Sequence, residues 1–205
     1  MIEVVDQRDV QRKGGVYARF PQSYVVCRLL KSINARRVLD VTYGVGRFYR
    51  LCRDGIELLV ASDPVKWEWV VAPDTFYQLT VWQLYDRVKR GDIVVPRVDV
   101  LVCDPPRWNT SVSYNRRSPY NFIIGTPSLI IDYSVKLANV LNVKHLLLHY
   151  NRILNIGKPV HVIEFHWFAR YLNTEGKNKS YYILYDVSSI DEQQSIEPTF
   201  GTLYT

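Results

Sequence analysis

Two glycines follow a short apolar segment and form a turn that can hold a ligand. Residues 37–41 are typical of a buried strand, and Gly44 and Gly46 come next, before an expected helix over residues 47–53. Glycine lets a backbone turn tightly and approach a ligand closely, and a helix start offers N–H groups to a carboxylate or phosphate. The third glycine of the dinucleotide fingerprint is missing, which argues against NAD. A plain strand-to-helix turn is the structural alternative.

A carboxylate closes the next apolar segment of the sequence. Asp63 follows residues 58–62 and lies 23 positions after Asp40. In a doubly wound α/β fold, a carboxylate at this place can accept hydrogen bonds from both hydroxyls of a ribose. A solvated aspartate before the turn-forming Pro64 is the structural alternative.

The third candidate is Asp104, which is followed by two prolines at the end of the apolar segment 98–103. Pro105 and Pro106 restrict the backbone to an extended conformation and remove two N–H donors. Their carbonyls and the ionised carboxylate are then acceptors only. This combination suits a ligand –NH2 group that donates two hydrogen bonds, although a purely structural turn would also use it.

The order of elements along the chain predicts a single, mostly parallel sheet. Short apolar strands alternate with helices expected near residues 21–33, 47–53, 65–95 and 128–141, which predicts parallel βαβ units. The strands expected over 160–169 and 180–187 would form a C-terminal antiparallel hairpin. We therefore predict one domain over residues 1–205, with an N-terminal extension over 1–20. Its fold class is α/β: a Rossmann-like, seven-stranded, mostly parallel sheet with helices on both faces.

In this order and spacing, the three elements resemble class I S-adenosylmethionine-dependent methyltransferases. The resemblance covers about residues 17–187 and is to the branch that methylates amino groups and carries a D/N-P-P-aromatic motif. It implies S-adenosylmethionine as cofactor, transfer of its methyl group directly to an amino nitrogen, and no metal. The cofactor-binding residues that it implies are Phe20, Gln22, Asp40, Thr42, Gly44, Gly46, Asp63 and Thr80.

The motif departs from the family pattern after its second proline. The family usually has an aromatic residue there, whereas this chain has Arg107 followed by Trp108. The resemblance implies catalytic roles for Asp104, Pro105, Pro106 and Trp108. Residues 107–127 interleave basic and aromatic side chains and form a candidate substrate loop. Its candidate substrate-binding residues are Arg107, Tyr114, Arg116 and Arg117.

Composition limits the function classes. The chain has 205 residues, 47% of them hydrophobic, and carries 26 basic against 20 acidic residues, a formal net charge of +6. This charge favours a nucleic-acid partner, although a thermophile-like surface would also explain it. No apolar run is long enough to span a membrane and no signal sequence is evident, so we expect a cytoplasmic protein. The three cysteines indicate neither a disulfide framework nor a zinc site.

Other chemistry-bearing residues favour structural roles. His145 and His149 have HxxxH spacing, but they lie in an expected strand with no following glutamate, so buried histidines are favoured over metal ligands. Glu164 and His166 should share one strand face and form a polar pair. Cys103 is expected to be a small buried side chain.

The sequence thus predicts a methyltransferase acting on an exocyclic amino group of a nucleic-acid base, with RNA favoured over DNA. This preference rests on the positive charge, on the loop of Arg and aromatic residues, and on the lack of room for the added target-recognition region that DNA methyltransferases of this branch usually carry. DNA adenine or cytosine amino-methylation is the first alternative. A non-catalytic nucleic-acid-binding protein or accessory subunit remains a second, because Arg107 replaces the usual aromatic. A protein glutamine as substrate and aminopropyl transfer are less favoured.

Overall fold

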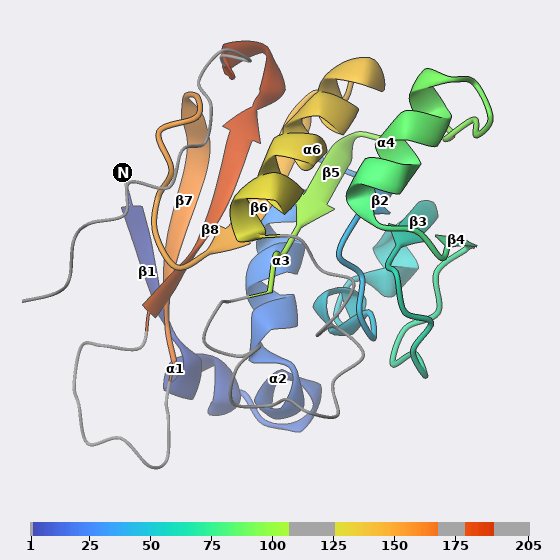
Figure 1. The fold of residues 1–205 in the computed structure, drawn as a ribbon. Coiled ribbons are helices and arrows are strands. Elements are labelled where there is room, and N and C mark those ends of the chain that lie inside the picture. Colours follow the sequence, from blue (N-terminus) through green and yellow to red (C-terminus); the bar gives the residue numbers. More distant parts are fainter. Residues whose placement is uncertain (1, 107–125, 168–178, 191–205) are drawn as a thin grey trace, which may run out of the picture.

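The computed structural model describes residues 2–106, 126–167 and 179–190, which form an α/β fold built on one eight-stranded sheet (Figure 1). The strand order is β1-β7-β8-β6-β5-β2-β3-β4. All neighbouring strands are parallel except the pairs that β8 makes with β6 and β7. The strands are β1 Ile2–Asp6, β2 Arg37–Asp40, β3 Leu58–Ser62, β4 Thr75–Tyr77, β5 Val100–Cys103, β6 His145–Tyr150, β7 Pro159–His166 and β8 Lys179–Asp186.

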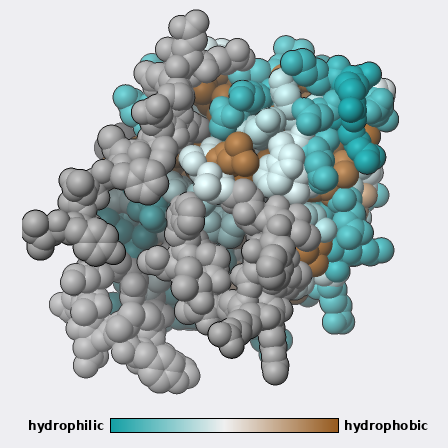
Figure 2. Space-filling model, in the orientation of Figure 1, coloured by the Kyte–Doolittle hydropathy of each residue, from teal (hydrophilic) through white to brown (hydrophobic). Residues whose placement is uncertain are grey.

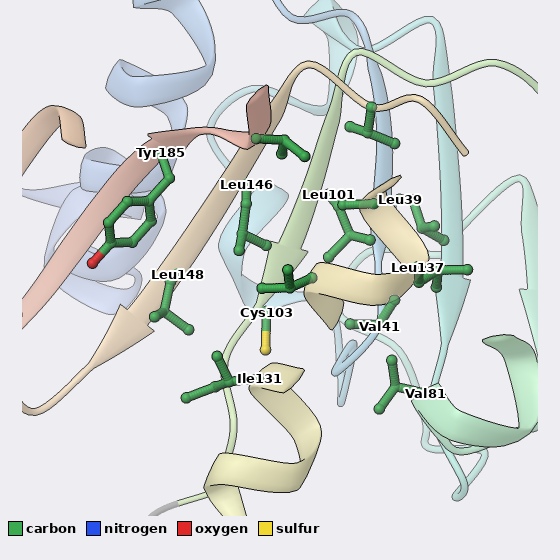
Figure 3. Packing of buried hydrophobic residues seen from close by; sticks show 14 of the residues in the cluster. Leu39, Val41, Val81, Leu101, Cys103, Ile131, Leu137, Leu146, Leu148 and Tyr185 are labelled. Atoms are coloured by element: carbon green, nitrogen blue, oxygen red, sulfur yellow. The ribbon is translucent and has the colours of Figure 1, made fainter. Parts of the chain in front are cut away.

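Helices cover both faces of this sheet. They are α1 Gln7–Gln11, α2 Gly15–Arg19, α3 Pro21–Ser32, α4 Val81–Lys89 and α6 Pro127–Val140, with 3-10 turns η1 Arg47–Tyr49, η2 Arg53–Gly55 and η4 Val187–Ser189. Alternate strand residues face opposite ways: Leu39 packs with α4 and α6, whereas Val38 packs with α3. Figure 3 shows the first of these two cores, in which Leu39, Leu101 and Leu146 of adjacent strands meet Ile131 and Leu137 of α6.

The sheet has one strand more than predicted. Residues 2–6, assigned to an extension, form β1, which pairs in parallel with β7 from Ile2↔Val162 to Asp6↔His166. Val4 and Ile2 remain half-exposed while Val5 is buried. One-sided burial at a sheet edge is a weak sequence signal, which explains why this strand was missed.

The helix predicted over 47–53 is replaced by the two 3-10 turns η1 and η2. The hydroxyl of Ser23 in α3 accepts a hydrogen bond from the N–H of Leu51 and donates one to the carbonyl of Phe48. The N–H of Leu51 is therefore bonded to α3 and does not donate to the carbonyl of Arg47, as an α-helix would require. The predicted helix within 65–95 is confined to α4, Val81–Lys89, and the short strand β4, Thr75–Tyr77, precedes it.

A disulfide joins Cys27 of α3 to Cys52, just after η1, with the two Cα atoms 5.6 Å apart. The expectation of no disulfide was therefore wrong. The two cysteines are 25 positions apart and have no local motif, so only the packing of α3 against η1 brings them together. Cys103 is free and fully buried, as expected.

The visible surface over α4 and α6 is mainly hydrophilic, with isolated apolar residues (Figure 2). Among the described residues, no helix combines the length and the apolar character that crossing a bilayer would require.

Candidate active site

A cavity of about 290 Å³ lies at the carboxyl ends of β2, β3 and β5, where loops leave parallel strands. This edge is the usual ligand position in an open α/β sheet. The predicted site residues that line the cavity are Gln22, Thr42, Gly44, Asp63, Thr80, Asp104 and Pro106. The structure therefore brings the glycine turn at Gly44, the residue Asp63 and the Asp-Pro-Pro motif together at one cavity.

Asp63 joins the loops after β2 and β3. One oxygen, Oδ2, accepts the N–H of Gly44 at 2.9 Å, and Oδ1 accepts the N–H of Val65 at 2.9 Å and the indole N–H of Trp67 at 3.3 Å. The residue is only 2% exposed, yet it lines the cavity. Asp63 thus holds the glycine turn in place and presents negative charge to a bound ligand.

The two glycines of the turn have different surroundings. Gly44 has φ +54°, lines the cavity, and a Cβ there would meet no atom within 4 Å. Gly46 has φ +75°, and a Cβ would lie 2.5 Å from the Tyr43 hydroxyl and 2.6 Å from the Val71 carbonyl. Gly44 therefore leaves room for a ligand, whereas Gly46 is required by the packing behind the turn. The element after Gly46 is the 3-10 turn η1 and not the expected helix, so no α-helix start faces the ligand here.

Asp40 lies behind the cavity wall and does not line it. It is 2% exposed; Oδ2 accepts the Tyr49 hydroxyl at 2.6 Å, and Oδ1 accepts the backbone N–H of Thr42 at 2.9 Å. Burial raises the pKa of Asp40 to about 7, opposed by the hydrogen bonds from Tyr49 and Thr42 and assisted by the nearby charges of Asp104 and Asp63. Asp40 thus organises the loop that forms the cavity wall.

Thr42 links the two central strand ends. Its hydroxyl oxygen accepts the backbone N–H of Asp104 at 2.6 Å, and its proton points to Asp40 Oδ1 at 3.4 Å. This contact ties the loop after β2 to the start of the Asp-Pro-Pro motif, so the positions of Gly44 and Asp104 are coupled.

The Asp104 carboxylate is held by an array of buried polar side chains. Asp104 Oδ1 lies 2.8 Å from His149 Nδ1, and His149 Nε2 lies 2.9 Å from the Ser180 hydroxyl. The indole N–H of Trp167 donates to the same hydroxyl at 2.8 Å. The ring of Tyr182 stacks on His149 with centroids 4.1 Å apart. The histidine ring is therefore fixed in both position and orientation.

The donors and acceptors of this array assign the histidine tautomer. An indole N–H only donates, so Ser180 accepts from Trp167. Among the described residues, His149 Nε2 is the only acceptor within reach of the Ser180 proton. The other nitrogen, Nδ1, then carries the histidine proton and donates it to Asp104. This order of donation keeps Asp104 an acceptor.

Ser180, His149 and Asp104 have the residue types of a Ser-His-Asp catalytic triad, but here the serine is buried and the aspartate is partly exposed, the opposite of what such a triad needs. Ser180 is fully buried and does not line the cavity, whereas the Asp104 side chain is 36% exposed and does. A serine nucleophile must reach its substrate. The array therefore serves the carboxylate and not a serine.

The remaining wall comes from the start of α4. Thr80 caps this helix by accepting the N–H of Gln83, and the Gln83 side chain accepts the Thr80 N–H in return. Val81 and Trp82 line the cavity beside Thr80. This wall offers apolar and aromatic surface without a carboxylate.

Four predicted site residues do not reach the cavity: Phe20, Asp40, Gly46 and Pro105 are absent from its lining, so the expectation that they contact a ligand there was wrong. Most of the predicted substrate loop 107–127 lies outside the described residues. This part of the loop includes all five of its predicted site residues, Arg107, Trp108, Tyr114, Arg116 and Arg117. No group of three or more His, Cys, Asp or Glu able to hold a metal occurs in the described part of the chain. Glu164 and His166 pair at 2.7 Å on one strand face, as expected.

Sequence reasoning missed His149, Ser180 and Trp167 as a group around Asp104. Parallel pairing places Cys103 opposite Leu148, so the residues that follow them, Asp104 and His149, are also neighbours. The HxxxH spacing drew attention to His149, but only the strand register indicates its partner. Arg47 and Phe48, which also line the cavity, follow directly from the glycine turn.

No known protein family and no curated protein matches the sequence. Among solved structures, the Thermoplasma acidophilum 1320 protein is 10% identical, with 88% of this chain and 97% of that one covered at a TM-score of 0.51. The N-methyltransferase NodS from Bradyrhizobium japonicum is 9% identical, with 81% and 94% covered at 0.49. The magnesium protoporphyrin IX methyltransferase from Synechocystis with bound SAM is 13% identical, with 80% and 77% covered at 0.46. The strand order and the first of these likenesses agree that the chain has a Rossmann-like α/β fold.

Proposed function

We propose that this protein is an S-adenosylmethionine-dependent methyltransferase that acts on an exocyclic amino group of a nucleic-acid base, with RNA favoured over DNA. The observation that carries the proposal is the Asp104 carboxylate, oriented by His149 at 2.8 Å, at the rim of a cavity that also contains Gly44 and Asp63. The resemblance of the sequence to class I methyltransferases rests on these same features: the glycine turn, Asp63 and the Asp-Pro-Pro motif.

The cavity residues fit this cofactor. The open space beside Gly44 admits a ligand against the backbone, and Asp63 offers an acceptor for ribose hydroxyls. Val81 and Trp82 provide the apolar and aromatic surface that a purine ring requires. The carboxylates of Asp63 and Asp104 favour a sulfonium cation electrostatically. When bound, S-adenosylmethionine supplies an electrophilic methyl carbon attached to sulfur.

Asp104 would orient and then deprotonate the accepting nitrogen. Because His149 occupies Oδ1, the other oxygen is available to accept N–H groups of the substrate amino group, whereas Pro105 is buried and does not line the cavity. These hydrogen bonds hold the nitrogen for in-line attack and favour a localised lone pair. The methyl carbon that the cofactor would supply would form a bond to this nitrogen as its bond to sulfur breaks, with the C–S electron pair going to sulfur. The nitrogen then loses one proton to the carboxylate.

The substrate is assigned to nucleic acid on charge and accessibility. The chain carries a formal net charge of +6, and Arg47 is exposed at the cavity wall. An amino group in a single-stranded RNA region can enter the cavity directly, whereas a base in a DNA duplex must first be flipped out.

The test combines cofactor binding with transfer of a labelled methyl group. Calorimetric titration with S-adenosylmethionine should show binding, and its absence would contradict the cofactor assignment. Labelled cofactor offered with total RNA, DNA and protein from the source cell should label RNA. Label in DNA would select the first alternative, and binding without any label would favour an accessory protein.

A further inference from the structure

A second cavity, of about 470 Å³, lies apart from the candidate active site, between α2, α3 and the segments before β2 and β3. Its floor contains apolar groups and the Cys27–Cys52 disulfide. Its walls carry cationic and aromatic side chains. We call it the α3 groove; its lining includes Tyr17, Tyr24, Arg28, Lys31, Asn34 and Arg36.

The chain segment that builds the α3 groove is strongly basic. Residues 10–56, which include the whole lining of the groove, contain ten Lys and Arg and two acidic residues, the buried Asp40 and the exposed Asp54. The eight basic residues of this segment that are exposed are Arg12, Lys13, Arg19, Arg28, Lys31, Arg36, Arg47 and Arg50. This stretch of the chain therefore has a formal charge of +8, ten basic minus two acidic residues, against +6 for the whole chain. Such a concentration creates a field that attracts polyanions.

Several of these cations are not neutralised locally. Arg12 pairs with Asp9, Arg28 with Glu3, and Arg36 with Glu57. Lys31, Arg47 and Arg50 make no ion pair with any residue in the described ranges. Their positive charge is thus available to a ligand.

Aromatic rings lie among the cations. Lys13 and Arg28 are positioned over the ring of Tyr24, at 5.2 and 5.5 Å from its centroid. Tyr17 meets the same ring edge to face at 6.1 Å and is itself 38% exposed. Cations beside accessible aromatic faces are the combination with which proteins hold the backbone and bases of single strands.

The α3 groove connects along the chain to the candidate active site. Arg47 lines the first cavity, and Leu51 and Cys52 line the α3 groove only four and five residues later. Arg50 is exposed between them. A polyanion bound in the groove can therefore continue towards the rim where Asp104 lies.

We propose that the α3 groove, with Arg50 and Arg47, binds the backbone of single-stranded nucleic acid and leads the strand to the methyl-transfer cavity. The proposal rests on the proposed function for its substrate class, but binding can be measured without catalysis. A lipid surface fits the groove less well, because the apolar side chains of α3, such as Val25 and Leu29, are buried against the sheet. A membrane-binding helix needs an apolar face free to enter the bilayer.

The test measures the affinity of the full-length protein for a short, labelled, single-stranded RNA of mixed sequence over a series of salt concentrations. For single strands, each phosphate contact contributes about 0.7 to the slope of log affinity against log salt concentration. The double variant Lys31→Gln/Arg50→Gln should bind more weakly and show a slope smaller by about 1.4. Tyr17→Ala should weaken binding about fivefold through lost stacking.

The matched control is Arg87→Gln/Lys89→Gln, which removes two exposed cations from α4 on the opposite face of the sheet. It should leave affinity and slope near the wild-type values. Equal effects of the control and of Lys31→Gln/Arg50→Gln, or no salt-dependent RNA binding by the wild type, would overturn the proposal. So would a Lys31→Gln/Arg50→Gln variant that loses binding to anionic lipid vesicles but keeps its RNA affinity.

Titration of the same samples with S-adenosylmethionine separates the two proposals. Retained cofactor binding together with lost RNA binding places the defect in the groove. Failure of the wild type to bind cofactor, with groove-dependent RNA binding intact, contradicts only the proposed function.

Discussion

His149 Nδ1 lies 2.8 Å from Asp104 Oδ1, and the histidine is 5% exposed while the aspartate side chain is 36% exposed. His149 is thus held inside the protein, whereas the Asp104 carboxylate reaches the cavity. Ser180 and Tyr182 fix the imidazole from behind, so the carboxylate orientation is set by β6 and β8 as well as by its own loop. The site is in this sense prepared before any ligand binds.

Replacing His149 should impair turnover more than cofactor binding. His149→Phe keeps a ring against Tyr182 but removes the hydrogen bond to Asp104, so kcat should fall by about 100-fold through misplacement of the carboxylate. His149→Gln, which retains a donor, should recover part of the loss. The cofactor Kd should stay near the wild-type value because His149 does not line the cavity. An equal kcat in all three proteins would contradict the positioning role, and 15N NMR of the wild-type imidazole should show the Nδ1–H tautomer.

Loss of the Asp63 carboxylate should weaken cofactor binding. Asp63→Asn replaces one of the two acceptor oxygens that hold Gly44 and Val65. Hydrogen bonds to charged groups contribute about 1.5–3 kcal/mol each, so calorimetry should show at least a tenfold higher Kd, that is, about 1.4 kcal/mol or more. The control is Asp86→Asn on the exposed face of α4, which should change neither Kd nor Tm. Unchanged binding by Asp63→Asn would exclude this residue from the cofactor site.

Buried Asp40 should make stability fall as pH rises. Its pKa is raised from 3.8 to about 7, so between these values the folded state keeps a proton that the unfolded state has lost. The unfolding free energy therefore decreases with pH across this window, by up to about 4 kcal/mol at about 1.4 kcal/mol per pKa unit. Asp40→Asn, which does not titrate, should remove this dependence. Urea unfolding at several pH values measures it, and parallel curves for the two proteins would refute the prediction.

The two turn glycines should respond differently to alanine. Gly46→Ala combines a left-handed φ with overlap against the Tyr43 hydroxyl and the Val71 carbonyl, so it should cost about 3 kcal/mol of stability. Gly44→Ala meets no atom and should cost about 1 kcal/mol, the cost of the backbone conformation alone. Its methyl group would project into the cavity and raise the cofactor Kd. Thermal unfolding and calorimetry distinguish the two variants, and the opposite ranking of Tm would contradict the packing described.

The Cys27–Cys52 disulfide should stabilise α3 against the turn that contains Arg47 and Phe48. Reduction, or Cys27→Ser, should lower the unfolding free energy by about 3 kcal/mol, as expected for a loop of this length. Alkylation of the denatured protein should modify only Cys103 without reductant and all three cysteines after reduction. Three alkylated cysteines in the unreduced protein would show that the bond is absent.

Local sequence signals were sufficient for the central part of the fold. Strands β2, β3, β5 and β6 are short apolar segments with turn residues after them, and a buried parallel sheet produces this pattern directly. The same signals located Gly44, Asp63 and Asp104, because the residue after a strand is identified once the strand is. Strand β1 was missed because an edge strand is only partly buried.

What the sequence determined by itself is therefore the α/β class and the residues that follow the central strands. The tertiary structure alone decided which of these residues face the ligand: Asp40 and Gly46 turn into the protein, whereas Asp63 and Gly44 line the cavity. It also decided the pairing of Asp104 with His149 and of Cys27 with Cys52. The first pair is 45 positions apart in the sequence and is set by strand register, and the second is 25 positions apart and is set by helix packing. A local sequence pattern cannot predict contacts between residues so far apart.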